Sequence, residues 1–124
     1  MRINEVSQQC GISIPTLRYY EKIGLIDEVQ RENGIRNYQA ADLERIEFIL
    51  CMKASGMSLE DLCVYFDLYR QGDDTLEERE HLLSQHKQHT FEKLQKIQQS
   101  LDYIEFKIDF TREKIQQRDA EKIL

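Results

Sequence analysis

Apolar positions in residues 1–70 recur every three or four residues within short blocks, and glycine-containing turns separate the blocks. This spacing predicts short amphipathic helices that each bury one face. We expect four of them, over residues 4–10, 13–22, 42–55 and 58–69. Asn4 is the expected cap of the first helix, and Ser58 opens a capping box at the fourth. The first two helices, joined by a tight turn at Gly11, predict a helix-turn-helix.

A β-hairpin is predicted between the second and third helices. Asn33-Gly34 is the strongest two-residue signal for such a turn, and it lies between two segments expected to be extended, Leu25-Ile26 and residues 35–38. A hairpin beside a helix-turn-helix forms a wing, which could bring Arg31, Asn33 and Arg36 to a flanking phosphate backbone. The alternative is a structural hairpin whose arginines are only solvated.

The second helix is the candidate DNA-reading element. Ser13 can cap its first amide groups, and Pro15 lies in the first turn, where its missing N–H removes no hydrogen bond. The predicted inner face consists of Ile14, Leu17 and Glu21. The predicted outer face carries two cations and a phenol, from Pro15, Arg18, Tyr19 and Lys22. Such a face suits a groove lined with phosphates and base edges, although an ordinary amphipathic surface helix has the same pattern.

From Leu76 onward the chain contains no Gly or Pro, which predicts one long helix. Apolar residues repeat within it at alternating intervals of three and four, at Leu94, Ile97, Leu101, Ile104, Ile108, Thr111 and Ile115. This is a heptad seam flanked by charged residues and glutamine. So narrow a stripe requires a partner helix, most simply the same helix of a second chain. Packing back onto its own domain is the alternative.

These blocks give the expected domain organisation. Residues 1–70 would form the DNA-binding domain, 71–75 a linker, 76–118 the dimerisation helix and 119–124 a tail. A chain of 124 residues has room for one compact domain plus an extension. The expected fold class is therefore mainly α, with a winged helix-turn-helix and a long C-terminal helix.

Charge and composition narrow the environment. The formal net charge is −6, and residues 1–50 hold 6 Lys and Arg against 8 Asp and Glu. DNA binding would therefore depend on a few placed cations, not on a general positive field. No apolar run is long enough for a membrane span, and the N-terminus lacks the apolar core of a signal peptide. Three cysteines without a pattern favour a reducing cytoplasm over a disulfide scaffold.

Most side chains that could carry chemistry have simpler explanations. Cys10, beside the helix-turn-helix turn, and Cys63 are expected to pack as small apolar residues. His81, His86 and His89 are expected to lie on a solvated helix face, and no cysteine spacing fits a zinc site. We predict no metal and no cofactor. A Cys–His enzyme is disfavoured because the chain has no Gly-rich phosphate loop and no acid pair in an apolar setting.

Several motifs in order resemble the MerR family of transcription regulators over residues 1–70. They are Glu5-Val6, Gly11-Ile12-Ser13, Thr16-Leu17-Arg18-Tyr19-Tyr20-Glu21, Gly24-Leu25-Ile26, Asn33-Gly34-Ile35-Arg36-Asn37-Tyr38, Asp42-Leu43 and Gly56-Met57-Ser58-Leu59. The resemblance implies a winged helix-turn-helix, a second helix pair, and a long helix that forms an antiparallel coiled coil in a homodimer. It also implies binding to palindromic promoter DNA, which the protein bends and untwists so that RNA polymerase can engage it.

The resemblance also implies particular DNA contacts. Thr16, Arg18 and Tyr19 would contribute from the second helix, and Arg36 and Tyr38 from the wing. With the candidates above, the predicted DNA-binding set is Ser13, Thr16, Arg18, Tyr19, Lys22, Arg31, Asn33, Arg36 and Tyr38. The predicted dimerisation set is Leu94, Ile97, Leu101, Ile104, Ile108 and Ile115. The chain departs from the family at Asp27-Glu28, where prolines are frequent, and at Ile35, where tyrosine is frequent.

Cys51 is the candidate effector-sensing residue. The run from Phe48 to Met57 resembles the branch that responds to aldehydes and nitrosothiols (AdhR- and NmlR-like), which has a lone cysteine in the same helix. A thiolate adds to electrophilic carbon, but at an ordinary pKa of about 8.5 only roughly 3% is thiolate at pH 7. Glu47, four residues earlier, would disfavour the anion, so an activating cation must come from elsewhere. A packed, inert cysteine is the alternative.

Other readings of the whole chain remain open. The family's cysteine-based metal and iron–sulfur sensors require cysteines after the dimerisation helix, and none follows Cys63 here. A different inducer, such as a metal ion or a small ligand, is one alternative. A coiled-coil adaptor that binds protein instead of DNA is another, and the acidic charge favours it slightly.

Overall fold

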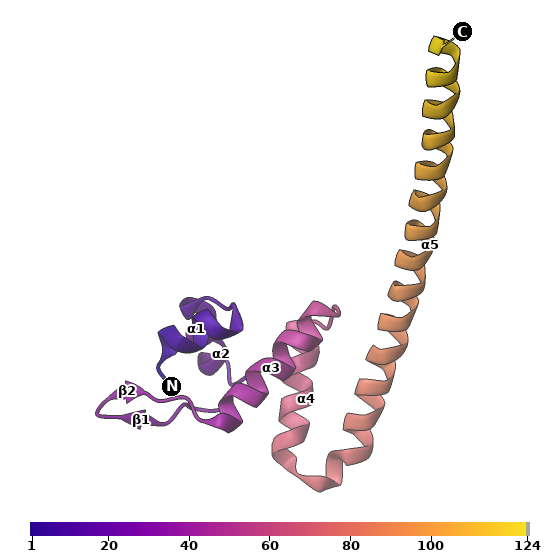
Figure 1. Cartoon of the computed structure of the whole chain (residues 1–124). Coiled ribbons are helices and arrows are strands. Elements are labelled where there is room, and N and C mark those ends of the chain that lie inside the picture. Colours follow the sequence, from indigo (N-terminus) through magenta and orange to yellow (C-terminus); the bar gives the residue numbers. More distant parts are fainter. Residues whose placement is uncertain (124) are drawn as a thin grey trace. The chain divides into compact units, whose positions relative to one another are not determined.

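Helices make up most of the computed structural model, which describes residues 1–123. Figure 1 shows the elements in order: α1 (Ile3–Cys10), α2 (Ile14–Lys22), β1 (Arg31–Glu32), β2 (Ile35–Arg36), α3 (Ala40–Ala54), α4 (Leu59–Gln71), the 3₁₀ turn η1 (Asp73–Thr75) and α5 (Leu76–Ile123). The chain divides into two compact units, Met1–Ser84 and the part of α5 from Gln85 onward. The predicted fold class, a helix-turn-helix with a long C-terminal helix, is confirmed.

The N-cap of helix α1 lies two residues before the expected cap. Arg2 is the N-cap, and its backbone N–H donates to the Glu5 carboxylate at 3.0 Å, so the expected cap at Asn4 is wrong. The Glu5 side chain, which reaches back to the free amide of Arg2, forms the second half of a capping box. This contact places the start of the helix nearer the N-terminus than expected. Gly11 ends α1 with a φ of 67°, and Val6 is fully buried.

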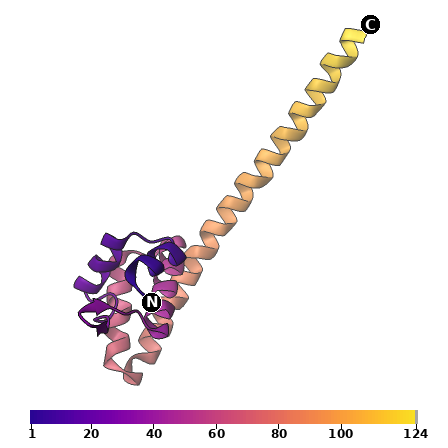
Figure 2. The ribbon, with the colours of Figure 1, turned by 60° about the vertical axis from the view of Figure 1, so that its left-hand side comes forward.

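Helix α2 has the predicted cap and a slightly different inner face. The Ser13 hydroxyl accepts the Thr16 amide at 3.2 Å, so this cap is confirmed. The buried side chains are Leu17 and Tyr20, whereas Glu21 is only half-buried. The pattern missed Tyr20 because a tyrosine that buries its ring looks like a polar position in the sequence. α1 and α2 lie beside each other in both ribbon views (Figures 1 and 2).

The hairpin has the predicted turn but a different first strand. Asn33 and Gly34 have φ of 53° and 78°, which is the backbone that a type I′ turn requires. Strand β1 is Arg31–Glu32, and Glu32 pairs with Ile35. The expectation that Leu25-Ile26 is an extended segment of this hairpin is wrong, because a two-residue loop pairs the residues directly beside it. Leu25 and Ile26 are instead buried in the core.

Helices α3 and α4 complete the core of the first unit. The Ser58 hydroxyl accepts a hydrogen bond from the Asp61 amide at 3.1 Å, so Ser58 caps α4 as predicted through one half of the expected capping box. α3 and α4 contact each other, and the two helices run side by side in Figure 2. The fully buried side chains of the unit come from α1 to α4 and the loop after α2: Val6, Leu17, Leu25, Ile26, Val29, Ile46, Ile49 and Leu62.

A buried threonine fixes the turn from α4 into α5. Thr75 is 4% exposed, and its hydroxyl lies 2.6 Å from the Leu68 carbonyl oxygen and 2.8 Å from that of Gly72. The Thr75 hydroxyl oxygen in turn accepts a hydrogen bond from Arg79 Nε at 3.1 Å. Because the hydroxyl is satisfied from both sides, this turn is an ordered part of the first unit.

The second unit is a single helix with no buried side chain among its described residues. The predicted seam residues are all exposed, from 43% at Ile115 to 66% at Ile97. Three exposed aromatic side chains, Tyr103, Phe106 and Phe110, lie on the opposite side of the helix from this seam. No helix in the described part of the chain is long and apolar enough to cross a membrane.

Candidate nucleic-acid interface

The outer face of α2 presents the predicted cations and phenol to solvent. Arg18 and Lys22 are exposed, and Tyr19 is 46% exposed. Ser13 and Thr16 lie at the start of the same helix, where the two hydroxyl oxygens are 2.6 Å apart. These side chains can reach base edges and phosphates only because Leu17 and Tyr20 anchor the opposite face of α2 in the core.

An ion pair joins the wing to α2. Arg36 of β2 donates from Nε to Glu21 Oε1 at 2.8 Å, and the two side chains are only 22% and 11% exposed. A charge-assisted hydrogen bond in such a sheltered place holds both groups in one geometry. The pair leaves the terminal nitrogens of Arg36 outside this bond, so the guanidinium can still meet a phosphate.

A hollow between α2 and the wing gathers three of the predicted cations. It has a volume of about 300 Å³, and Arg18, Glu21, Lys22, Glu28 and Arg36 line it. Three cations face two carboxylates here, although the chain as a whole is acidic. The hollow therefore has an excess of one positive charge beside α2.

The tip of the hairpin is separate from this hollow. Arg31 and Asn33 are exposed and do not line it. Arg31 donates from Nη1 to the Gly34 carbonyl at 3.2 Å and so closes its own turn. These two residues are placed to touch a ligand that extends beyond α2, as the tip of a wing does.

Tyr38 differs from the other predicted DNA-binding residues because it is buried. It is 3% exposed, and its hydroxyl has no hydrogen-bond partner among the described residues. Burial raises the pKa of the Tyr38 phenol. Its backbone N–H donates to the Met1 carbonyl at 2.7 Å, so the base of the wing is tied to the start of the chain. In this structure Tyr38 supports the wing from within and offers no atom to a ligand.

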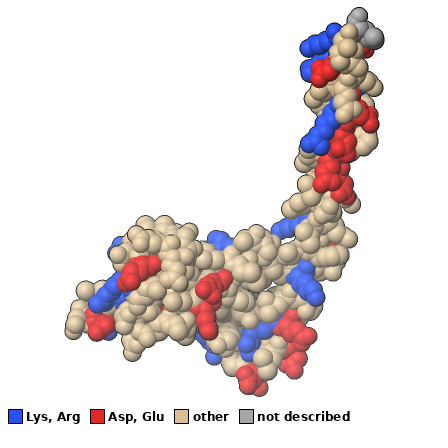
Figure 3. All heavy atoms as spheres, viewed as in Figure 1, with Lys and Arg blue, Asp and Glu red and all other residues tan. Residues whose placement is uncertain are grey.

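Charges of both signs share the surface around these residues. On the face seen in Figure 3, Lys and Arg side chains alternate with Asp and Glu and do not gather in one basic patch. The predicted dependence on a few placed cations therefore agrees with the charge distribution on this face.

The three thiols differ in their surroundings. Cys51, on α3, is exposed, whereas Cys10 and Cys63 are half-buried and pack against the core. Burial raises the pKa of the Cys10 thiol, and the negative charge of Glu47 adds to the rise. Cys51 is thus the most accessible thiol in the described chain. Within residues 1–123, no group of three His, Cys, Asp or Glu side chains is placed to hold a metal ion.

Glu21 and Glu28 are site residues that sequence reasoning did not assign to the interface. Glu21 was expected only to face inward, and its partner Arg36 lies 15 residues away across the hairpin. An acidic residue seldom signals a DNA surface, and nothing local in the sequence identifies its partner. The signal that could have found it is the register of the Asn33-Gly34 hairpin, which directs Arg36 toward α2.

Two protein-family models and several known proteins match this chain. A family model described as MerR HTH family regulatory protein matches residues 1–67, and another described as MerR, DNA binding matches residues 43–105. The chain is similar to the HTH-type transcriptional regulator AdhR of Bacillus subtilis (strain 168), with 44% identity over 93 residues. That alignment covers 74% of this chain and 66%, about two thirds, of the relative.

Solved structures show the same architecture. The crystal structure of HiNmlR, a MerR family regulator lacking the sensor domain and bound to promoter DNA, matches with a TM-score of 0.81 and 32% identity over 90% of each chain. A MerR family transcriptional regulator from Listeria monocytogenes matches with a TM-score of 0.80 and 40% identity over 88% of this chain and 83% of that one. These proteins are transcriptional regulators and not enzymes.

Proposed function

Because the chain belongs to the MerR family of HTH regulatory proteins, and within it to the AdhR- and NmlR-like branch, we propose that it regulates transcription by binding promoter DNA as a homodimer. One observation carries the proposal: the Arg36–Glu21 ion pair ties the wing to α2, so cations from two elements line one hollow. The surface comprises Ser13, Thr16, Arg18, Tyr19, Lys22, Arg31, Asn33 and Arg36, with Tyr38 beneath it.

The α2 face reads the groove and the wing contacts the backbone beside it. Arg18 is the strongest candidate for a base or phosphate contact, because it is exposed at the middle of α2. Loss of one such arginine costs about 1–3 kcal/mol of binding free energy, which is roughly 5- to 150-fold in affinity.

The DNA test measures how tightly two variants, each with one cationic side chain replaced by glutamine, bind one duplex. The duplex is selected from a random pool by the unaltered protein, and affinity is followed by fluorescence anisotropy over a range of salt concentrations. Arg18→Gln should weaken binding about tenfold or more and make it less dependent on salt. Lys87→Gln is the matched control, because Lys87 is an exposed cation on α5 and is not among the residues assigned to this surface. Unchanged binding by Arg18→Gln would remove Arg18 from the DNA contacts. If the unaltered protein selects no duplex from the pool, the coiled-coil adaptor, which self-associates but does not bind DNA, would be favoured instead.

The dimer forms through α5. Residues 76–118 would pair with the same helix of a second chain in an antiparallel coiled coil through Leu94, Ile97, Leu101, Ile104, Ile108 and Ile115. The exposure of every one of these side chains in the single chain supports this assignment. A two-fold dimer presents two copies of the α2 surface, which fits a palindromic site. We further propose that the dimer distorts promoter DNA so that RNA polymerase can engage it.

Cys51 is the proposed sensor of thiol-reactive electrophiles. Its thiolate would add to the carbonyl carbon of an aldehyde, and the resulting alkoxide would take a proton from water to give a hemithioacetal. Cys51 is exposed whereas Cys10 and Cys63 are half-buried against the core, which supports this choice among the three thiols. Similarity to a regulator named AdhR supports the aldehyde class. A metal ion or another small ligand is the alternative inducer.

The sensing test is intact-mass spectrometry with peptide mapping after brief exposure to formaldehyde, methylglyoxal or a nitrosothiol. We expect an adduct at Cys51 with Cys10 and Cys63 spared near neutral pH. Because the pKa of Cys10 is raised, its share of adducts should grow only as the pH rises above the ordinary thiol range. Cys51→Ser should abolish promoter induction by aldehydes and leave DNA affinity unchanged. Induction that survives this substitution would move the signal to another site.

A further inference from the structure

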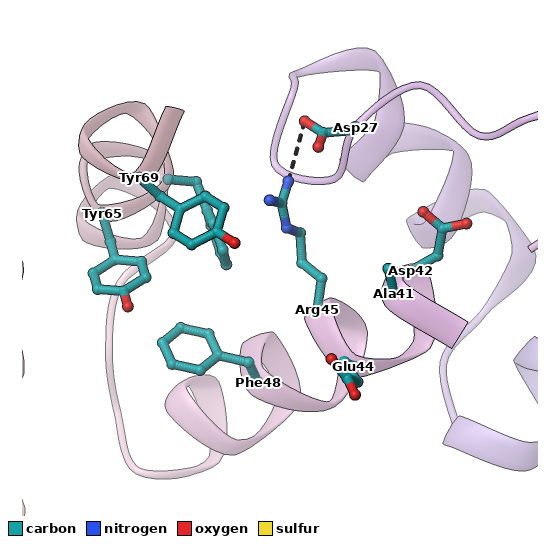
Figure 4. Close-up of a pocket in the computed structure, with 9 residues that line it drawn as sticks. Asp27, Ala41, Asp42, Glu44, Arg45, Phe48, Tyr65 and Tyr69 are labelled. Atoms are coloured by element: carbon teal, nitrogen blue, oxygen red, sulfur yellow. Dashed lines mark ion pairs between the residues drawn. The ribbon is translucent and has the colours of Figure 1, made fainter. Parts of the chain in front are cut away.

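A cavity in the first unit lies outside the DNA surface and does not include Cys51. Its volume is about 430 Å³, within the roughly 300–1,000 Å³ range of ligand cavities. α3 supplies Arg45 and Phe48, and α4 supplies Tyr65, Phe66 and Tyr69. Figure 4 shows the phenol rings on one side, Phe48 below them, and Arg45 facing the rings across the space. The cavity therefore has aromatic walls and one cationic side.

The aromatic walls are ordered by contacts with one another. The Phe48 and Tyr65 rings stack with centres 5.1 Å apart and planes 23° apart. Phe66 packs edge-on against both, at 5.6 Å and 5.3 Å. Preformed rings of this kind accept another planar ring by stacking or by edge contact, without a large ordering cost.

Arg45 is held in the cavity by aromatic contacts. Its guanidinium carbon lies 4.5 Å from the centre of the Phe66 ring and 5.5 Å from that of Tyr69, and its side chain is 13% exposed. Nη1 lies 3.1 Å from Asp27 Oδ1, which is an ion-pair distance, yet it has no well-directed hydrogen bond among the described residues. A buried guanidinium nitrogen without a well-directed hydrogen bond would be stabilised by an acceptor that lies along one of its N–H bonds.

The acidic side chains around the cavity leave room for such an acceptor. Asp42 and Glu44 point away from the rings in Figure 4. Asp42 already accepts the Gln39 amide at 2.8 Å at the start of α3. Asp27 is 62% exposed and has a second cationic partner, because Arg70 Nε lies 3.4 Å from the same Asp27 oxygen. Asp27 can therefore release Arg45 and keep a counter-ion.

We propose that this cavity binds a small planar aromatic carboxylate. The ring of the ligand lies against Phe48, Tyr65 and Tyr69, and its carboxylate replaces Asp27 on Arg45 with in-line hydrogen bonds. The exchange swaps one carboxylate for another, so the buried guanidinium is never left without a counter-charge. Asp27 lies between α2 and the wing, so the ligand would loosen a link from α3 to the DNA-binding elements.

Benzoate is the probe, and binding is measured on the full chain without DNA by isothermal titration calorimetry and ligand-detected NMR at 0.15 M salt. Benzylammonium is the comparison ligand, because it keeps the ring and reverses the charge. Arg45→Gln should weaken benzoate binding about tenfold or more, since it removes a charge-assisted pair. Arg31→Gln is the matched control, because it removes an exposed arginine of the same unit.

Asp27→Asn gives an expectation of the opposite sign. It removes the internal carboxylate that competes for Arg45, so benzoate should bind several-fold more tightly than to the unaltered protein. A merely structural role of Asp27 would weaken binding or leave it unchanged. The proposal is overturned if benzylammonium binds as well as benzoate, or if Asp27→Asn, folded by circular dichroism, fails to tighten benzoate binding. Because no DNA and no thiol chemistry enter the experiment, failure here is distinct from failure of the proposed regulator.

Discussion

The first unit of the chain buries its apolar side chains, whereas the second leaves them exposed. Residues Met1–Ser84 enclose a shared core, in which Ile46, Ile49 and Leu62 have no exposed surface. From Gln85 onward no described side chain is buried, although leucine, isoleucine and aromatic residues are frequent. The first unit thus satisfies its hydrophobic residues within one chain, and the second can do so only with another molecule.

This difference separates two kinds of stability. The core of the first unit should set a free energy of unfolding that is a property of the single chain. The seam of α5 should set a dissociation constant, so its contribution depends on protein concentration. Without a partner helix, α5 would leave its apolar stripe exposed to water. The predictions below test whether the two contributions are separable.

The largest expected effect comes from the core. Ile46→Ala removes a fully buried side chain and should lower the free energy of unfolding by about 2–5 kcal/mol, through lost burial and a residual cavity. Urea denaturation of the full chain measures this change. Val64→Ala, at an exposed position of α4, is the matched control and should change stability little. A loss of dimer affinity in Ile46→Ala would show that the two kinds of stability are coupled.

A seam substitution should act on association instead. Ile104→Ala should remove about 2 kcal/mol of apolar burial per chain and raise the dimer dissociation constant at least tenfold, as measured by sedimentation equilibrium. Gln99→Ala is the control, because Gln99 lies on the same helix but outside the seam. If Ile104→Ala associates like the unaltered chain, the dimer uses a different surface, or the helix does not pair through this stripe.

The smallest expected effect lies beneath the wing. The Tyr38 hydroxyl is buried without a partner, so Tyr38→Phe should leave stability near neutral pH unchanged or raise it by about 1 kcal/mol. Because the pKa of Tyr38 is raised in the folded chain, the unfolded phenol ionises first, and stability should fall as the pH rises through about 10. Tyr38→Phe should reduce this alkaline loss in urea titrations.

The same variant separates two roles of Tyr38 in the proposed complex. A direct hydrogen bond from the phenol to DNA would be lost in Tyr38→Phe, and affinity would fall. Support of the wing from within needs only the ring, so affinity would be retained. Retained affinity would remove Tyr38 from the set of direct contacts that the family resemblance implies.

Local features of the interface could be predicted from the sequence, and contacts between elements could not. The cap at Ser13, the exposure of Arg18 and Lys22, and the turn at Asn33-Gly34 follow from neighbouring residues alone. The burial of Tyr38 and the partner of Arg36 depend on how the wing lies against α2. Leu25-Ile26 was wrongly predicted to be extended because an apolar pair after a helix suits a strand and a buried turn equally well.

The sequence by itself determined the helices, the caps at Ser13 and Ser58, the type I′ turn and the heptad stripe of α5, since each depends on backbone hydrogen bonds and periodicity within a few residues. Only the tertiary structure decided that Glu21 holds the wing, that Asp27 meets both Arg45 and Arg70, and that Arg45 faces an aromatic cavity. These contacts join residues 15 to 43 positions apart. The packing of whole elements brings such residues together, and no local pattern in the chain encodes it.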